Sequence, residues 1–322
     1  MKLETQCLHA GYSPESTTNS CAVPLYKTSS FVFNNTEHAA NLFGLRELGN
    51  IYTRLMNPTT DVLEQRVAAL EGGAAALGIA SGTSAVFYSI INLAQEGDEI
   101  VSANNLYGGT YTQFSDILPK FGINVKLVDP NNPANFAAAI TDKTKALFCE
   151  SVSNPGLDVA DIRAIANVAN DHGIPLIVDS TFSTPYLTNP IEHGASIVIH
   201  SLTKWMGGHG NGIGGIVVDS GTFDWKNGNF PLYDNPDNSY HGLRWGHDLP
   251  EPLAPVAYIL RMRTVPLRNL GACISPDNSW QFLQGIEPLP LRMERHCDHS
   301  LGVAKHLQAH ESVDWVRFPG LE

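Results

Sequence analysis

The feature that most limits the fold of this chain is an alternation of short apolar runs with stretches of helical period. The apolar runs cover residues 99–103, 124–129, 146–150, 176–179 and 197–200. The clearest helical stretch between them is 161–172, where apolar residues recur every three or four positions and Gly173 follows. Runs this apolar are typical of strands buried on both faces of a mainly parallel sheet. The sequence therefore predicts an α/β fold with helices covering the sheet.

The remaining segments add helices and two further strands. Helices are expected at 61–70, after Ser81-Gly82-Thr83-Ser84, and later near 253–263, 279–283 and 289–306. A strand is expected at 215–218, followed by a polar segment with scattered aromatic residues at 220–249. The run 313–317 has the pattern of a strand that would open a new layer. We expect the chain to stop before that layer is complete.

Composition excludes several classes of protein. The chain has 322 residues, of which 43% are hydrophobic and 16% charged, as in a globular protein with a large core. A net charge of −12 argues against nucleic acid or an anionic membrane surface as the main partner. The 5 cysteines include no Cys-x-x-Cys pair, which indicates a reducing compartment. Without a signal-like N-terminus or an apolar run of about 18 residues, we expect a cytoplasmic protein.

Polar residues follow several of the predicted strands directly, which points to a ligand site. They include Glu150, Asn154, Asp179 and the segment Ser201-Leu202-Thr203-Lys204. Ligands of open α/β sheets bind outside the carboxyl ends of the strands. We therefore expect these side chains to converge on one crevice, although they are distant in sequence.

Lys204 is the residue in this group that most suggests chemistry. A lysine directly after an apolar strand is costly to bury, and a desolvated amine can form a Schiff base with a carbonyl compound. Asp179 also ends a predicted strand, 25 positions earlier (204 − 179). A Schiff-base cofactor with a pyridine ring needs an acidic partner at its ring nitrogen. The pair therefore indicates pyridoxal 5'-phosphate as the cofactor.

Other residues can hold the remaining parts of that cofactor. Ser81, Gly82 and Thr83 precede a helix and offer backbone N–H groups to a phosphate. Ser201 and Thr203 offer hydroxyls beside the lysine, and Tyr107 can lay its ring on the cofactor face. Each feature alone also fits a helix cap, a turn or a packed aromatic side chain. Their joint occurrence favours the cofactor site.

The motifs together resemble those of a known family. They are Leu8-His9-Ala10-Gly11, Tyr52-Thr53-Arg54-x-x-Asn57-Pro58-Thr59, Ala80-Ser81-Gly82-Thr83-Ser84-Ala85, Glu150-Ser151-Val152-Ser153-Asn154-Pro155, Val178-Asp179-Ser180-Thr181 and Ser201-Leu202-Thr203-Lys204. In this combination, which covers nearly the whole chain, they resemble the pyridoxal-phosphate-dependent enzymes of cysteine and methionine metabolism, the trans-sulfuration enzymes. The resemblance implies an aspartate-aminotransferase-like fold, known as fold type I, with a truncated C-terminal domain.

The resemblance also implies roles for individual residues. Lys204 would hold the cofactor as a Schiff base, Asp179 would pair with its ring nitrogen, and Tyr107 would stack on the ring. The residues expected around the phosphate and ring hydroxyl are Ser81, Gly82, Thr83, Ser201, Thr203 and Asn154. Tyr52 and Arg54 would reach the phosphate of a neighbouring subunit. The minimum catalytic unit is then a homodimer, usually paired into a tetramer.

The expected domain division follows from the same resemblance. Residues 1–58 would form an N-terminal arm and inter-subunit segment, and 59–265 the large cofactor-binding domain. Residues 266–322 would contain connecting helices and the start of an incomplete C-terminal domain.

Within the family, the segments 221–249 and 279–293 resemble the O-acetylhomoserine sulfhydrylase branch. That branch implies a γ-replacement in which sulfide or a thiol displaces acetate to give homocysteine or methionine. A cystathionine γ-synthase or methionine γ-lyase activity is the alternative inside the family. A cofactor-binding but catalytically impaired fragment, or a non-catalytic relative, is the alternative of another class, because no position matches the family's substrate-carboxylate arginine. The acyl group and the preferred sulfur donor stay open.

Three other motifs have weaker interpretations. Ser201-x-x-Lys204 also occurs in penicillin-recognising serine enzymes, but there it opens a helix, and here a strand precedes it. Gly210-x-Gly212-x-x-Gly215 lacks the helix that a dinucleotide site requires after it. His296, Cys297 and His299 lie on one predicted helix, whereas zinc sites recruit ligands from several places, so no metal site is expected.

Overall fold

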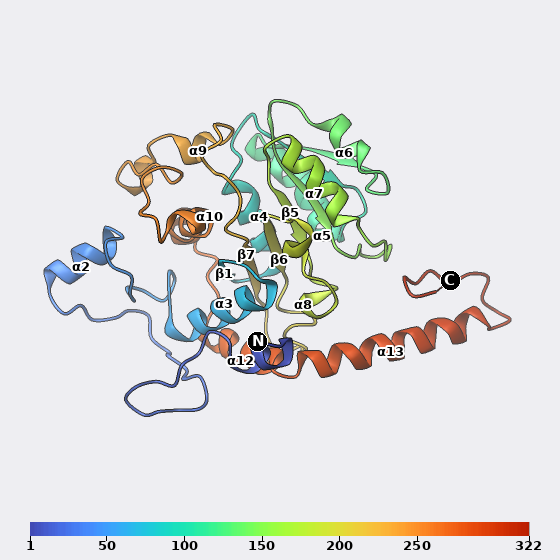
Figure 1. Cartoon of the computed structure of the whole chain (residues 1–322), viewed down its shortest axis with the longest axis horizontal. Helices are drawn as coiled ribbons and strands as arrows, with labels where there is room; N and C mark the ends of the chain where they lie inside the picture. The colour runs from blue at the N-terminus through green and yellow to red at the C-terminus, as the bar shows by residue number, and fades with distance from the viewer. Residues whose placement is uncertain (322) are drawn as a thin grey trace.

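A seven-stranded sheet forms the centre of the molecule in the computed structural model, which describes residues 1–321 (Figure 1). The strands are β1 (Ala75–Ile79), β2 (Glu99–Ala103), β3 (Asn124–Val128), β4 (Thr144–Glu150), β5 (Leu176–Asp179), β6 (Ile197–His200) and β7 (Gly215–Asp219). Their order across the sheet is β1-β7-β6-β5-β4-β2-β3. Only β7 runs antiparallel to its neighbours β1 and β6 within the described sheet. The predicted, mostly parallel α/β sheet is confirmed.

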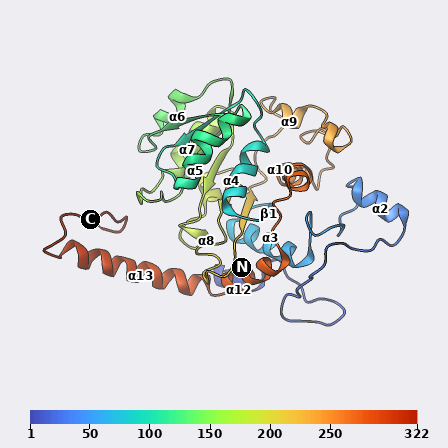
Figure 2. The same ribbon diagram turned by 180° about the vertical axis from the view of Figure 1, so that it is seen from behind.

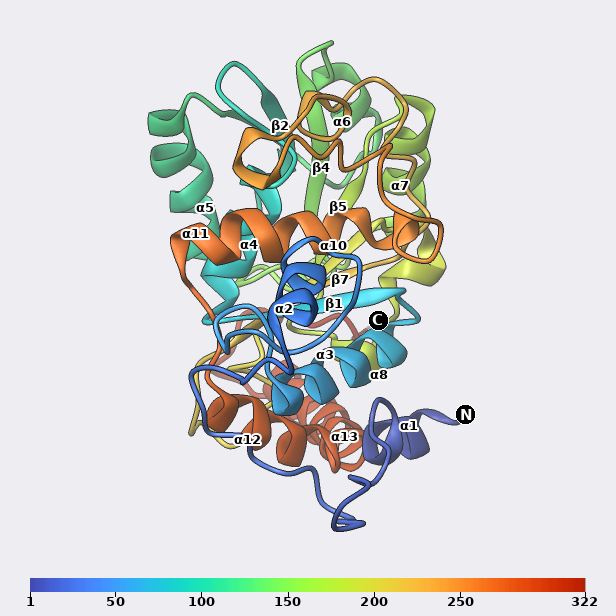
Figure 3. The same ribbon diagram turned by 90° about the vertical axis from the view of Figure 1, so that its left-hand side faces the viewer.

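Helices cover both faces of this sheet. Those nearest to it are α3 (Pro58–Glu71), α4 (Gly82–Ile91), α5 (Gly108–Thr112), α6 (Ala134–Ala139), α7 (Ile162–Asp171) and α10 (Ala257–Met262). Figure 3 shows α4 and α5 on one side of β4 and β5, with α7 on the other. Every residue of β4 and of β7 is buried. Coverage on both sides is the reason that the middle of each strand is apolar, at 146–149 in β4 and 216–218 in β7.

The remaining helices lie around the edge of the sheet layer, below it and in the two terminal segments. They are α1 (Leu3–His9), α2 (Thr36–Phe43), α8 (Thr184–Leu187), α9 (Pro231–Asp234), α11 (Arg268–Leu270), α12 (Pro276–Ile286) and α13 (Leu289–Gln308). Figures 1 and 2 show α2 on an arm away from the sheet, and α13 projecting from the opposite side of the body. Among the helices in residues 1–321, none has the length and apolar character needed to cross a bilayer.

Local sequence signals predicted most of these elements. The strands expected at 99–103, 176–179 and 197–200 have the same limits in the structure. Helix α7 begins as predicted, because the Asp161 carboxylate caps it by accepting a bond of 3.0 Å from the Ala164 N–H. Strand β1 was not predicted, since its sequence Ala-Ala-Leu-Gly-Ile has low strand propensity. It forms because it pairs with β7 along its whole length.

The strand predicted at 313–317 is wrong. This segment has no regular structure, and Trp315 is 78% exposed. Within the described part of the chain no strand lies beside it, so its backbone groups have no ladder to join. An ion pair between Arg317 and Asp158 joins this segment to the body of the molecule. Strand propensity without a partner strand did not decide the conformation.

The aromatic residues of the segment 220–249 form a small core of their own. The Trp225 ring stacks on Tyr233, with centroids 4.4 Å apart, and on Tyr258 of α10, with centroids 5.1 Å apart. All three side chains are buried. The segment is therefore packed onto α10, and its aromatic residues serve that packing.

Asp219, the last residue of β7, generates a prediction about pH. Its carboxylate is fully buried, and only one of its oxygens has a partner, the Gly221 N–H at 2.9 Å. Burial raises the pKa of Asp219 from 3.8 to about 7. Between these two pH values the folded chain keeps a proton that the unfolded chain releases, so stability falls as pH rises.

We expect Asp219→Asn to remove this part of the pH dependence. The free energy of unfolding should be measured by urea unfolding at pH 5 and pH 7.5. At pH 7.5 it should be larger for the variant than for the wild type. The difference between variant and wild type should grow by about 1 kcal/mol or more across this range. An identical difference at both pH values would show that Asp219 is ionised in the folded protein throughout.

Candidate active site

A cavity of about 710 Å³ opens at the carboxyl ends of β4, β5 and β6. The predicted site residues that line it are Ser81, Gly82, Thr83, Tyr107, Asn154, Asp179, Ser201, Thr203 and Lys204. They come from segments up to 123 positions apart (204 − 81). The expected convergence of these side chains on one crevice is confirmed.

Asp179 lies at the floor of the cavity, at the end of β5. Its Oδ1 accepts bonds from the Thr181 N–H at 3.0 Å and the Thr181 hydroxyl at 2.6 Å. Burial raises the pKa of Asp179 above its usual range, although the bonds from Thr181 and the nearby His200 act against that shift. A cation placed against this carboxylate would be stabilised, since a buried negative charge lacks solvent.

Glu150 lies beside Asp179, because the two residues are register partners on β4 and β5. Its side chain is 7% exposed and lines the same cavity. Burial, followed by the negative charge of Asp179, raises the pKa of Glu150 to about 8. The sequence placed Glu150 at a strand end but gave it no role in the site.

Lys204 differs from the expectation that it would be buried. Its side chain is exposed where it lines the cavity. Strand β6 ends at His200, so Lys204 comes after the buried strand, in a turn where its N–H donates to the Ser201 carbonyl at 3.2 Å. The motif Ser201-x-x-Lys204 therefore lies in a turn after a strand and does not open a helix. The amine is accessible to a ligand in the cavity.

The N-terminus of α4 meets the turn that carries Lys204. Ser81 caps this helix, accepting a bond of 3.1 Å from the Ser84 N–H. A Cβ atom on Gly82 would lie 2.6 Å from the Ser201 Cβ, so only glycine permits this approach. The free N–H groups of a helix start and the Ser201 hydroxyl thus share one small region, which suits an anion.

Thr203 is less free than the sequence implied. Its hydroxyl donates to the Gly214 carbonyl at 3.2 Å and accepts from the Gly214 N–H at 3.1 Å. This pair of bonds fixes the glycine-rich segment 210–215 against the turn at 202–207 that carries Lys204, which we call the lysine turn. That segment leads directly into β7, so the pattern does not have the strand-then-helix context of a dinucleotide site.

Tyr107 and Asn154 enter the cavity from two loops. Tyr107 directly precedes α5, and its side chain is 48% exposed. Its N–H donates to Glu150 Oε1 at 2.7 Å, and the Asn154 N–H donates to Glu150 Oε2 at 3.0 Å. One carboxylate therefore binds both loops.

Tyr52 and Arg54 are the predicted cofactor-binding residues that do not line this cavity. They lie together on the N-terminal arm, with the Arg54 guanidinium 5.4 Å from the centre of the Tyr52 ring. Arg54 also donates to the Arg268 carbonyl. Within one chain, the structure does not bring these two residues to Lys204.

Sequence reasoning missed two residues that shape the cavity. Thr181 orients Asp179 and also accepts a bond of 2.8 Å from the Ser201 N–H; the Asp-x-Thr spacing after a strand could have indicated this turn. Arg292 of α13 donates to the carbonyls of Trp205 at 2.7 Å and Gly285 at 2.6 Å. Its guanidinium is thus used to hold the lysine turn, and no local signal pointed to it.

His296, considered above for a metal site, lies on α13 beside Trp205, with ring centroids 5.0 Å apart. No group of three or more His, Cys, Asp or Glu side chains in residues 1–321 could hold a metal ion.

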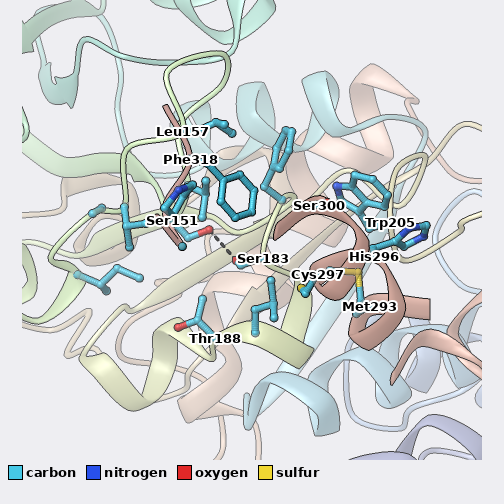
Figure 4. Close-up of a pocket in the computed structure, with 18 of the residues that line it drawn as sticks. Ser151, Leu157, Ser183, Thr188, Trp205, Met293, His296, Cys297, Ser300 and Phe318 are labelled. Carbon is cyan, nitrogen blue, oxygen red and sulfur yellow. Dashed lines mark hydrogen bonds between the residues drawn. The ribbon is translucent and has the colours of Figure 1, made fainter. Parts of the chain in front are cut away.

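A second cavity, of about 820 Å³, adjoins the first (Figure 4). The two share the lining residues Val152, Phe182, Trp205 and His296. The second cavity extends along α13 from Met293 to Leu301 and to Phe318 near the C-terminal end. Trp205, the residue after Lys204, therefore separates two connected spaces.

The residues present fit pyridoxal phosphate. The Asp179 carboxylate, whose charge the surroundings oppose, the start of α4 and the exposed Lys204 amine all line one cavity. These three features are the ones that a ring nitrogen, a phosphate and a carbonyl group require.

Comparison with known proteins gives a consistent result. A family model described as "Cys/Met metabolism PLP-dependent enzyme" matches residues 4–322. The O-acetyl-L-homoserine sulfhydrylase of Leptospira meyeri is 55% identical over 99% of this chain and 73% of its own length. The homocysteine synthase of Schizosaccharomyces pombe is 49% identical over 99% of this chain and 74% of its own length.

A solved structure from Campylobacter jejuni subsp. jejuni, described as an O-acetylhomoserine (thiol)-lyase, has the same fold. It superposes with a TM-score of 0.95 and 40% identity, covering 100% of this chain and 77% of that one. That protein contains a lysine carrying a pyridoxyl 5'-monophosphate group.

Close packing between α12 and the lysine turn gives a prediction. A Cβ on Gly285 of α12 would overlap the Gly207 carbonyl oxygen, three residues after Lys204. We expect Gly285→Ala to lower the free energy of unfolding by about 1–3 kcal/mol, because an overpacked contact must open.

Gly302→Ala is the matched control. A Cβ at Gly302 of α13 meets no atom within 4 Å, so alanine should raise stability by about 0.5–1 kcal/mol. Urea unfolding of both variants checks this. Equal midpoints for the two variants would contradict the close contact.

Proposed function

This chain belongs to the family of pyridoxal-phosphate-dependent enzymes of cysteine and methionine metabolism, and we propose that it performs a γ-replacement on O-acetylhomoserine. Sulfide or a thiol forms the new C–S bond at the γ-carbon while the C–O bond to acetate breaks, giving homocysteine or methionine. The proposal is supported by the names of relatives that are 49–55% identical over nearly the whole chain. Its main structural support is the placement of Lys204 and Asp179 in one cavity.

The proposed cofactor contacts follow the cavity wall. Lys204 would hold the cofactor carbonyl carbon and Asp179 its ring nitrogen. The start of α4 and Ser201 would hold the phosphate, and Tyr107 would cover one face of the ring. When bound, pyridoxal phosphate supplies a ring that withdraws electrons from the substrate carbon.

Two side chains of this chain would move protons. The Lys204 amine, exposed in the cavity, is the proposed base for the proton on the substrate α-carbon. The Tyr107 hydroxyl is the proposed second acid–base group, and it lines the same cavity. Asp179 would hold a proton on the ring nitrogen, because its own negative charge is poorly compensated in the protein.

A homodimer is the proposed catalytic unit, and we propose pairing into a tetramer and a cytoplasmic location with it. Tyr52 and Arg54 lie outside the cavity of their own chain, as expected for residues that reach a neighbouring subunit. The same arm exposes Val32 at 95% and Leu48 at 67%, more apolar surface than an isolated arm would favour. The cysteines in the described structure form no disulfide, which suits a reducing compartment.

Borohydride reduction tests the assignment of Lys204. After incubation with pyridoxal phosphate and reduction, peptide mass spectrometry should find the pyridoxyl group on Lys204, since its amine is the one in the cavity. Lys204→Ala should lose the label. Lys226→Ala, which changes an exposed lysine outside the cavity, should keep it. A label on another lysine in the wild type would contradict the assignment.

Acetate release tests the proposed reaction. The wild type should release acetate from O-acetylhomoserine when sulfide is present. Asp179→Asn should lower kcat about 100-fold or more, because the charge that stabilises the transition state is lost. Asp277→Asn, which alters an exposed carboxylate paired with Lys27, should leave kcat unchanged. Equal kcat values for the wild type and Asp179→Asn would remove Asp179 from the reaction.

A further inference from the structure

Glu150 has an unusual set of partners for a buried carboxylate. Each of its oxygens accepts one backbone N–H, from Tyr107 at 2.7 Å and from Asn154 at 3.0 Å. In the described structure it has no ion pair. Burying a carboxylate beside a second one is costly, so a purely structural position would favour a neutral side chain.

Its two acceptor oxygens distinguish glutamate from the neutral side chain of the same shape. A glutamine at this position would present one oxygen and one NH₂ group, and the NH₂ would face a backbone N–H. Burial raises the pKa of Glu150 to about 8, which shows how strongly the surroundings oppose its charge. Glutamate gives each of the two N–H groups an acceptor oxygen of its own, which glutamine cannot do.

The backbone that carries Glu150 is fixed relative to Asp179. Ser151 follows Glu150, and Ser180 follows Asp179. Ser183 bonds to both serine hydroxyls, at 2.7 Å to Ser151 and 2.7 Å to Ser180. Figure 4 shows the Ser151–Ser183 bond beside the second cavity. These buried hydroxyls tie the ends of β4 and β5 together, so Glu150 has a rigid base.

We propose that Glu150 is a positioning residue that holds Tyr107 and Asn154 in place relative to Asp179. Tyr107 and Asn154 are 47 positions apart (154 − 107), and Glu150 binds the backbones of both. It acts on the cofactor only through these two residues. The inference rests on the proposed cofactor site, because Tyr107 and Asn154 gain their importance from that site.

Hydrogen exchange on the full chain loaded with pyridoxal phosphate tests the hydrogen bonds. In Glu150→Gln, at least one of the amides of Tyr107 and Asn154 should exchange at least about tenfold faster than in wild type, because one N–H loses its acceptor and its loop is released. Glu99→Gln is the control, since it removes a carboxylate of β2 that binds Lys126 of β3, and it should leave both amides unchanged. Unchanged exchange at both amides in Glu150→Gln overturns the proposal.

The dissociation constant for pyridoxal phosphate tests whether Glu150 acts on the cofactor through Tyr107 and Asn154. Glu150→Gln should raise it about fivefold or more in the wild-type background, and less than about twofold in Tyr107→Ala/Asn154→Ala. An equal factor in both backgrounds overturns the proposal, because Glu150 would then act directly or through general stability. Faster exchange with an unchanged dissociation constant overturns it as well.

A second variant covers the case in which Glu150→Gln does not fold. Glu150→Asp keeps both oxygens but withdraws them by one methylene, and it should give the same exchange pattern. No change in Glu150→Asp overturns the proposal. The borohydride experiment tests the proposed function independently, because it reports which lysine binds the cofactor.

Discussion

The parallel pairing of β4, β5 and β6 is the constraint on which the site depends. Parallel strands end at the same edge of a sheet, so the residues that follow them meet there. The register places Glu150 beside Asp179 and Asp179 beside Ile199, two residues before Ser201. The bond from the Ser201 N–H to Thr181 continues this contact beyond the strands. The lysine turn is therefore positioned by backbone pairing as much as by its own sequence.

This arrangement places negative charges close together in a poorly solvated region. Burial raises the pKa of both Glu150 and Asp179, and Asp179 adds to the rise at Glu150. His200, at the end of β6, opposes the shift at Asp179 and is itself held by a 2.6 Å contact with buried Glu71. A site that opposes its own charge in this way loses stability when empty and gains it when a ligand places a positively charged group against the carboxylate.

The sequence predicted the parts of the site that depend on local signals. Asp179 and Lys204 were found because each comes at or just after the end of an apolar run, and Ser81 because it caps a helix. The same reasoning failed where pairing with a neighbouring strand decides whether a segment becomes a strand. The strand at 313–317 did not form because no strand in residues 1–321 lies beside it, whereas β1 formed despite low propensity because it pairs with β7. Tyr52 and Arg54, predicted to reach a neighbouring subunit, lie away from the cavity of their own chain.

Long-range contacts explain what the sequence left out. The role of Glu150 depends on a bond to Tyr107, 43 positions earlier, and that of Arg292 on carbonyls up to 87 positions away. Neither contact leaves a periodic or spacing signal. The exposure of Lys204 also escaped prediction, because an apolar strand predicts burial only as far as the strand extends. Packing between distant segments fixes these features, and it becomes visible only in three dimensions.

A crystal structure of the full chain with pyridoxal phosphate tests the central claim most directly. The structure should show the cofactor joined to Nζ of Lys204, its ring nitrogen against the Asp179 carboxylate and its phosphate at the start of α4. A cofactor attached to another lysine, or one whose ring nitrogen lies away from Asp179, would contradict the claim that the strand ends of this sheet build the site.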